Sequence, residues 1–286
     1  REAGIPLVLL WYDNPLRYLA TIASVYADNV LLLTTIDSKC LLELKTLGFN
    51  RVGYFPIWRL TSNFQPALSK EGMRCELSFS GGHMSREYFE TVYVPRYAPP
   101  FSRLLFCENE QKRRVRWALL ERFIALRRDT CRHVDVYDFL RANVGINPLE
   151  PSFGCWSDLL MQYQKILERE PLFEAVGSVP EVTLQVYGGA DVVLHKREVM
   201  AAAWDRVRFH PALDRRTELQ RLYNATEINL GLSQFPRAVH NRYFECAACG
   251  GFMLGEYKED LDGLFEVGQE IVCFHDLQEL PELIRF

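Results

Sequence analysis

The sequence predicts an α/β protein with two halves, each built on a parallel β-sheet, and a helical insertion. Three observations lead to this prediction. The chain has 286 residues, and at about 150 residues per domain this length suits two domains. Short apolar strand patterns alternate with helical patterns over residues 5–58 and 182–284. Between these ranges lies a stretch of about 110–177 whose apolar spacing is helical.

Composition excludes several classes of protein. Apolar types make up 48% of the chain and charged types 24%, which disfavours disordered and collagen-like chains. The net charge of −4 gives no general attraction to nucleic acid or to an anionic membrane, so any anion site must be local. No apolar run reaches the roughly 18 residues that a membrane helix needs. The eight cysteines are scattered, as in a reduced cytoplasmic protein, and we expect a cytoplasmic location.

The first half begins with two strands of parallel-sheet type. Ile5–Trp11 and Val30–Thr35 are continuous apolar runs, typical of strands buried on both faces. Ser38 is the predicted cap of a helix that runs through Leu47 and ends at Gly48. Arg51–Phe55 is the third predicted strand, and we place this N-terminal domain over residues 1–73.

The second half, residues 74–286, opens with an alternating strand over Cys75–Ser80. A turn at Gly81-Gly82-His83 follows, and a helix is predicted from Ser85. The helical insertion, at about 100–178, contains a basic helix (Gln111–Arg128) and an amphipathic one (Ser157–Phe173). Residues 143–156 carry glycine and proline and are predicted to form a loop.

From Val182 the α/β alternation resumes. The pattern predicts, in order, a strand over Val182–Tyr187 with a turn at Gly188-Gly189, a helix over Arg216–Ala225, a strand over Glu227–Gly231, a helix from Arg242, a break at Gly250-Gly251, a strand over Phe252–Leu254, a helix near Leu261–Phe265, a strand over Glu270–Phe274 and a helix over Leu277–Ile284.

The helix from Arg242 carries the most informative side chains. Arg242 and Glu245 lie three positions apart and therefore share a helix face. Free N–H groups at a helix N-terminus and an arginine suit a phosphate, and a carboxylate can accept both hydroxyls of a ribose. This spacing predicts a nucleotide site. The alternative is an ordinary ion pair between a first-turn glutamate and an arginine.

The sequence resembles the CgeB-like (spore-maturation-type) glycosyltransferases. Its C-terminal half carries the resemblance in Arg242–Gly251, Leu222–Leu230 and Leu264–Val272, supported by the strand and glycine at Val186–Gly188. Leu10–Pro15 and Leu47–Pro56 are similar to the N-terminal half of the family. The resemblance covers about residues 5–58 and 182–284, and the insertion between these ranges is not matched to the family.

This resemblance implies a GT-B fold, in which two Rossmann-like domains face a cleft and the second domain holds a nucleotide-diphosphate sugar. By the same resemblance, Glu245 binds the ribose of the donor and Arg242 lies near the diphosphate. The implied donor-binding residues are Ser80, Gly81, Gly82, Arg86, Tyr187, Gly188, Asn241, Arg242, Glu245 and Cys249.

Two departures from the family pattern bear on the chemistry. Related retaining enzymes have a sugar-binding glutamate eight positions before the ribose-binding one, where this chain has Arg237. Retention or inversion of the sugar therefore stays open. The first half of the family normally begins with further strands before the one matching Ile5–Trp11, so we expect the N-terminal domain to be incomplete.

Asp13 and His240 are the candidate catalytic residues. Asp13 follows a buried strand at the edge where α/β sheets bind ligands, which suits acid–base chemistry. The alternative for Asp13 is an Asx turn that caps the next helix. His240, like His83, could hydrogen-bond a donor phosphate or sugar, and the alternative for each is a solvated loop histidine.

The Cys246-Ala-Ala-Cys249 spacing is that of a zinc or redox pair, but no second ligand pair follows it in the sequence. We therefore interpret both cysteines as packing residues and expect no metal. The basic helix around Lys112–Arg128 could meet an acidic partner or nucleic acid; a solvated face is the interpretation we prefer.

Together, these observations predict a metal-independent glycosyltransferase that uses a nucleotide-sugar donor, without a nucleic-acid partner or a transmembrane segment. Its acceptor, a glycan, a protein or a small molecule, is not specified by the sequence. Two alternatives stay open: a non-catalytic nucleotide-sugar-binding or scaffold protein, and a nucleotide-sugar epimerase of the same fold.

Overall fold

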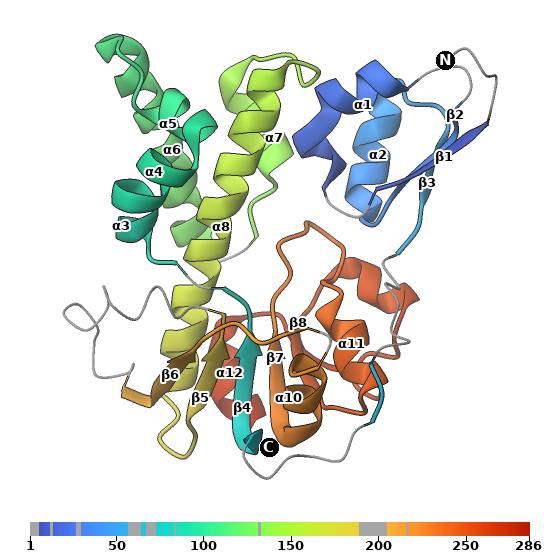
Figure 1. Ribbon diagram of the computed structural model, residues 1–286, viewed down its shortest axis with the longest axis vertical. Helices are drawn as coiled ribbons and strands as arrows, with labels where there is room; N and C mark the ends of the chain where they lie inside the picture. The colour runs from blue at the N-terminus through green and yellow to red at the C-terminus, as the bar shows by residue number, and fades with distance from the viewer. Residues whose placement is uncertain are drawn as a thin grey trace. The chain divides into compact units, whose positions relative to one another are not determined.

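The computed structural model describes residues 6–11, 14–26, 30–56, 64–66, 73–82, 84–130, 133–188, 205–215 and 217–286 (Figure 1). Contacts within the chain divide it into two compact units, and each unit is assembled from separate segments. Unit 1 consists of Arg1–Ile57, Tyr93–Lys165 and Gln234–Ala238. Unit 2 consists of Trp58–Val92, Ile166–Ser233 and Val239–Phe286. The helical segment 93–165 thus has its contacts in unit 1, while a domain boundary at residue 73 stays a prediction.

Unit 1 contains a three-stranded parallel sheet of order β1-β2-β3, made of β1 (Leu7–Leu10), β2 (Val30–Thr35) and β3 (Val52–Tyr54). All three predicted strands are present. The expectation that the first is buried on both faces is wrong, because β1 lies at the edge of the sheet and its Leu7, Val8 and Leu10 are exposed. Helix α1 (Leu19–Val25) follows a short 3-10 turn, η1 (Pro15–Tyr18).

Helix α2 (Ser38–Thr46) differs from the prediction at its first turn. Its cap is Asp37 rather than Ser38: the Asp37 side chain accepts the N–H groups of Lys39 and Cys40. The predicted end is confirmed, since Gly48 follows the helix with a φ of +89°, a conformation that favours glycine.

The segment 93–165 of unit 1 is mainly helical, in line with the predicted helical insertion. It contains α4 (Val94–Tyr97), α5 (Pro99–Leu105), α6 (Glu110–Thr130), α7 (Val136–Val144) and the first part of α8 (Pro151–Gly177). The predicted loop over 143–156 is wrong at both ends. Helix α7 extends to Val144, and α8 begins at Pro151, because a proline is tolerated in the first turn of a helix, where its missing N–H costs nothing.

Unit 2 contains a six-stranded sheet of order β6-β5-β4-β7-β8-β9, in which every pair of neighbours is parallel. The strand order reverses between β4 and β7. Ligands of open α/β sheets bind beyond the carboxyl ends of the strands at such a reversal. The strands are β4 (Cys75–Ser80), β5 (Leu184–Tyr187), β6 (Val207–His210), β7 (Thr226–Gly231), β8 (Met253–Glu256) and β9 (Val272–Phe274).

Helices cover both faces of this sheet. On one face, Phe79 of β4 packs edge-on against Phe173 of α8, with ring centroids 5.6 Å apart, and α12 (Leu280–Arg285) completes the layer. On the other face, α10 (Leu219–Ala225) and α11 (Arg242–Ala248) share an apolar cluster that contains Tyr223 and Tyr243. The shorter elements are α3 (Arg86–Tyr88), a π-helical turn η4 (Phe89–Tyr93), η7 (Glu259–Gly263) and η8 (Leu277–Glu279).

The predicted α/β class with two parallel sheets is confirmed. Strand β6 was not predicted, and the helix expected near Leu261–Phe265 is the 3-10 turn η7. In the part of the chain that the structure describes, no helix is both long enough and apolar enough to cross a membrane.

Candidate functional site

Two glycine turns meet at the carboxyl edge of the unit 2 sheet. The Gly81 N–H donates to the Tyr187 carbonyl at 2.7 Å, and so joins the ends of β4 and β5. A Cβ on Gly188, whose φ is +123°, would lie 2.8 Å from the Gly82 nitrogen. Conversely, a Cβ on Gly82 would lie 3.0 Å from the Gly188 carbonyl oxygen. Backbone therefore packs on backbone here, and the predicted Ser80–Gly82 and Tyr187-Gly188 segments come together.

Helix α11 is fixed against the neighbouring strands by Tyr243. The Tyr243 hydroxyl donates to the Glu256 carbonyl at 3.0 Å and also lies 3.2 Å from the Gly231 carbonyl oxygen. The ring needs glycine beneath it, because a Cβ on Gly255 would lie 2.4 Å from a ring carbon. This packing sets the position of the first turn of α11, which carries Arg242 and Glu245.

Glu245 is buried, with 1% of its surface exposed. Its Oε1 accepts the Asn241 side-chain amide at 2.6 Å and forms an ion pair with Arg215, from the loop before α10. The glutamate is thus paired with an arginine, but not with Arg242, the partner that the sequence spacing had offered. The second oxygen, Oε2, accepts no hydrogen bond from any described residue. A buried carboxylate with one open acceptor atom can receive a ligand hydroxyl.

Two half-buried arginines lie beside the end of β4. The Arg242 Nη1 is 3.5 Å from the position that a Cβ on Gly81 would take. The Arg169 guanidinium lies over the Phe79 ring, 5.6 Å from its centroid. Burial lowers the pKa of both side chains, that of Arg169 to about 10. The charge of Arg242 adds to the shift at Arg169, and the charge of Arg215 adds to the shift at Arg242. Among the described residues, neither arginine forms an ion pair, although the charges of Glu168 and Glu245 favour the protonated forms of Arg169 and Arg242, respectively.

Arg169 was not predicted as a site residue. It belongs to α8 and lies 90 positions after Phe79 in the sequence, so local motif spacing does not connect the two. One signal was available: Arg169 lies three residues after Ile166 and four before Phe173, on the apolar stripe of its helix. A cation on a buried stripe is unusual enough to mark a candidate.

The remaining predicted site residues have other surroundings. Arg86 pairs with Glu90 at 2.6 Å, and the Ser80 hydroxyl lies 3.4 Å from the Tyr223 hydroxyl. The Tyr187 ring stacks on that of His210, which has its centroid 4.6 Å away. The positions of Asp13 and His83 lie outside the described residues.

His240 lies at the start of α11. Its Nδ1 accepts the Arg242 N–H at 3.3 Å, which assigns the ring proton to Nε2 when the imidazole is neutral. In this tautomer Nε2 is the donor atom of the ring.

Cys246 and Cys249 are buried in the apolar cluster behind α11. Burial, with a smaller contribution from the charge of Glu245, raises the pKa of the Cys249 thiol to about 11, and burial raises that of Cys246 as well. Both thiols are therefore protonated near neutral pH, whereas metal ligation requires the thiolate. The described residues include no cluster of three His, Cys, Asp or Glu side chains that could hold a metal ion.

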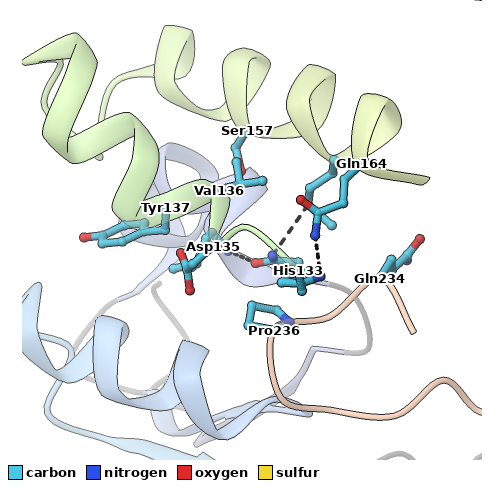
Figure 2. A pocket seen from close by; sticks show the side chains of 11 residues that line it. His133, Asp135, Val136, Tyr137, Ser157, Gln164, Gln234 and Pro236 are labelled. Carbon is cyan, nitrogen blue, oxygen red and sulfur yellow. Dashed lines mark hydrogen bonds between the residues drawn. The ribbon is translucent and has the colours of Figure 1, made fainter. Parts of the chain in front are cut away.

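Unit 1 has a small cavity between α7, α8 and the Gln234–Pro236 segment (Figure 2). His133 and Gln164 form a side-chain hydrogen bond on its wall, and Ser157 and Asp135 line it as well. Its volume is about 10 Å³, enough for about one water molecule. The cavity is too small for a sugar.

Comparison with solved structures finds HepE of Anabaena. The structure of HepE in complex with UDP-glucose aligns with 12% sequence identity and a TM-score of 0.51, over 98% of this chain and 62% of HepE. The complex of HepE with UDP aligns over the same shares, with 12% identity and a TM-score of 0.52. This chain thus spans less than two thirds of HepE. The likeness establishes a shared fold and confirms the predicted GT-B type of α/β architecture.

A search of curated protein sequences finds no match. One family matches part of the chain, residues 168–286, and its description is "Glycosyl transferase-like". The matched range contains β5–β9 and α11, and with them Arg169, Arg242 and Glu245. The part of the chain that carries the buried glutamate and both arginines is therefore similar to the glycosyl transferase-like family.

Proposed function

We propose that this protein is a glycosyltransferase that moves a hexosyl group from a nucleotide-diphosphate sugar to an acceptor. The observation that carries the proposal is the arrangement around Glu245: a buried carboxylate with an open oxygen, beside Arg242, on the same sheet edge as Arg169. The similarity of residues 168–286 to the glycosyl transferase-like family supports it.

In this proposal, Glu245 binds the donor ribose. The open Oε2 accepts one ribose hydroxyl, and Oε1 accepts the other as Arg215 moves aside; Arg215 is 44% exposed and can do so at little cost. Asn241, which donates to Oε1 at 2.6 Å, keeps the carboxylate in orientation. Glu245 is a binding residue here, not an acid or base.

The two arginines would stabilise the leaving group. Departure of the sugar places negative charge on the diphosphate, and preorganised cations at that point lower the barrier. Helix α11 has only seven residues, so its dipole is short and the arginines must supply most of the charge. The sequence suggested that the helix N-terminus stabilises the leaving diphosphate; in this proposal Arg169 and Arg242 supply most of that stabilisation. Two such cations make a divalent metal unnecessary for the leaving group.

The finer assignments are proposals on the same footing. Asp13 and His240 are the candidate catalytic residues, CgeB-like is the proposed subfamily, and the cytoplasm is the proposed location. The HepE structures hold UDP-glucose and UDP, which supports UDP-glucose as the first donor to test.

The test is thermal unfolding with UDP-glucose and with GDP-, ADP-, TDP- and CMP-linked sugars, on the wild type and Glu245→Gln. Glu227→Gln, which changes an exposed glutamate on β7, is the matched control. A donor at 100 times its Kd adds about 2.7 kcal/mol to the stability. We expect one nucleotide class to raise the Tm of the wild type and the control, and not of Glu245→Gln.

No shift with any nucleotide sugar would overturn the proposal. A shift accompanied by release of an isomerised donor in the absence of acceptor would also overturn it, in favour of an epimerase. Transfer of radiolabelled sugar from the identified donor to an acceptor, unaffected by EDTA, would establish the reaction and its independence of metal.

A further inference from the structure

A second, larger pocket lies within unit 1, where η1, the segment Tyr93–Phe101 and α8 meet; Figure 1 shows α4 and α5 beside α8. Its volume is about 430 Å³, within the range of about 300–1,000 Å³ that is usual for small-molecule sites. The residues that line it are Arg17, Tyr18, Tyr93, Ala98, Pro100, Phe101, Gly154, Cys155, Asp158 and Gln162.

Aromatic side chains form part of the pocket wall. Tyr18, Tyr93 and Phe101 line it, and Tyr18 is 38% exposed. The Tyr18 ring is held from outside the pocket, because Trp11 packs on it with centroids 5.5 Å apart. Aromatic rings with a polar tip can contact the apolar face of a ligand and also hydrogen-bond its edge.

Polar groups from η1 and α8 complete the wall. Arg17 pairs with Asp158 at 2.5 Å, and the Gln162 amide lies 3.4 Å from the same carboxylate oxygen. The two elements pack closely, since a Cβ on Gly154 would lie 2.4 Å from the Arg17 carbonyl oxygen. The three polar side chains are therefore held by rigid segments, and their distances allow them to contact one ligand together.

The charges in this pocket cancel. Arg17 and Asp158 are the charged side chains among the lining residues, and they neutralise each other. A phosphate or carboxylate ligand would need an uncompensated cation, which the lining residues do not supply. A purely apolar ligand would shield three polar side chains from water without offering them further hydrogen bonds. Aromatic faces combined with an amide, a carboxylate and a guanidinium suit a neutral molecule with many hydroxyl groups.

We propose that this pocket is a binding site for a neutral saccharide. Its use as the acceptor site of a glycosyl transfer rests on the proposed function, whereas saccharide binding itself does not. In this role Tyr18 and Phe101 contact the sugar ring, and Asp158 and Gln162 hydrogen-bond its hydroxyls.

The test uses the whole protein without nucleotide. Saturation-transfer NMR with methyl β-D-glucoside and cellobiose as probes measures binding, and glucose 1-phosphate is the anionic probe. We expect the neutral probes to bind and the phosphate not to. Tyr18→Ala and Gln162→Leu should each weaken binding at least tenfold, while Gln278→Leu, an exposed position in unit 2, should not change it.

Asp158→Asn provides a second, independent readout. This variant removes the carboxylate and leaves Arg17 as the one charged side chain among the described residues that line the pocket, so glucose 1-phosphate, which the wild type should not bind, should now bind measurably. Absence of a signal from either neutral probe with the wild type would overturn the proposal, as would binding that Tyr18→Ala and Gln162→Leu leave unchanged.

The outcome is separable from that of the proposed function. The UDP-glucose thermal shift should persist in Tyr18→Ala and Gln162→Leu, which also shows that these variants are folded. If Tyr18→Ala and Gln162→Leu lose saccharide binding but keep the UDP-glucose thermal shift, the pocket is the saccharide site. Saccharide binding without a thermal shift from any nucleotide sugar would support the saccharide site and overturn the proposed glycosyltransferase function.

Discussion

The carboxylate of Asp37 accepts the backbone N–H of Ala238 at 2.8 Å, although the two residues are 201 positions apart in the sequence. The same oxygen accepts the Arg237 N–H, also at 2.8 Å. The other oxygen accepts the N–H groups of Lys39 and Cys40 at the start of α2. One fully buried side chain thus caps a helix and holds a segment from a distant part of the chain in unit 1.

We predict that Asp37→Asn lowers the free energy of unfolding by about 2–3 kcal/mol, because the amide keeps one acceptor oxygen and places an NH₂ against N–H donors. Urea unfolding followed by circular dichroism measures the change. Asp276→Asn is the matched control: this aspartate caps η8 through a single exposed hydrogen bond, and its loss should cost less than about 1 kcal/mol. Equal losses in the two variants would contradict the role given to Asp37.

Replacing Arg169 or Arg242 by methionine should weaken UDP binding about tenfold to 100-fold, since hydrogen bonds to charged groups contribute about 1.5–3 kcal/mol. Calorimetric titration measures the affinity, with Arg208→Met, an exposed change on β6, as the control. Uridine, which has no phosphate, serves as the second ligand. If the variants lose uridine affinity as much as UDP affinity, the arginines support the structure of the site and do not contact the phosphates.

Gly255→Ala should destabilise unit 2 by about 1–3 kcal/mol, because the new methyl group would overlap the Tyr243 ring, whose nearest carbon is 2.4 Å away. Gly263→Ala is the control, since a Cβ there meets no atom within 4 Å. Thermal unfolding of both variants gives the comparison. A neutral Gly255→Ala would show that Tyr243 does not fix the position of α11.

The Cys249 thiol should make stability depend on alkaline pH. Its folded pKa of about 11 lies above the value of about 8.5 in unfolded chains, so between these values the folded protein keeps a proton that the unfolded chain releases. The contribution is therefore complete below pH 8.5 and is lost as the pH rises toward 11.

The measurement compares the wild type with Cys249→Ala at pH 8 and pH 10, by urea unfolding in the presence of a reductant. The difference in stability between the two proteins should shrink by about 1–2 kcal/mol at the higher pH. A difference that stays constant would show that the thiol is not desolvated.

Much of the α/β framework could be predicted, because parallel strands are apolar on both faces and stand out in the sequence. The predicted bounds of β2 and β4 agree with the structure to the residue. Strand β6 has only four residues, one of them the exposed Arg208, and so lacks that signature. Helix α7 was missed because its start depends on a cap: the Asp135 side chain accepts the Asp138 N–H.

The candidate site was predictable only where its residues are neighbours in the sequence. Arg242 and Glu245 share one helical turn, and their spacing is visible in the chain. Arg215 and Arg169 reach the same region from 30 and 76 positions away, counted from Glu245. No periodicity links such distant positions, and a single sequence cannot show which arginine a buried glutamate will meet.

The way the chain alternates between the two units constrains how this architecture can be recombined. The five residues Gln234–Ala238 belong to unit 1, although they follow most of the unit 2 segments in the sequence. A chimera joined between the end of β7 and Arg237 would therefore inherit from one parent the Asp37 carboxylate and from the other the backbone that it binds. A graft of the C-terminal half made at such a junction has to carry the matching first turn of α2 with it to keep these hydrogen bonds.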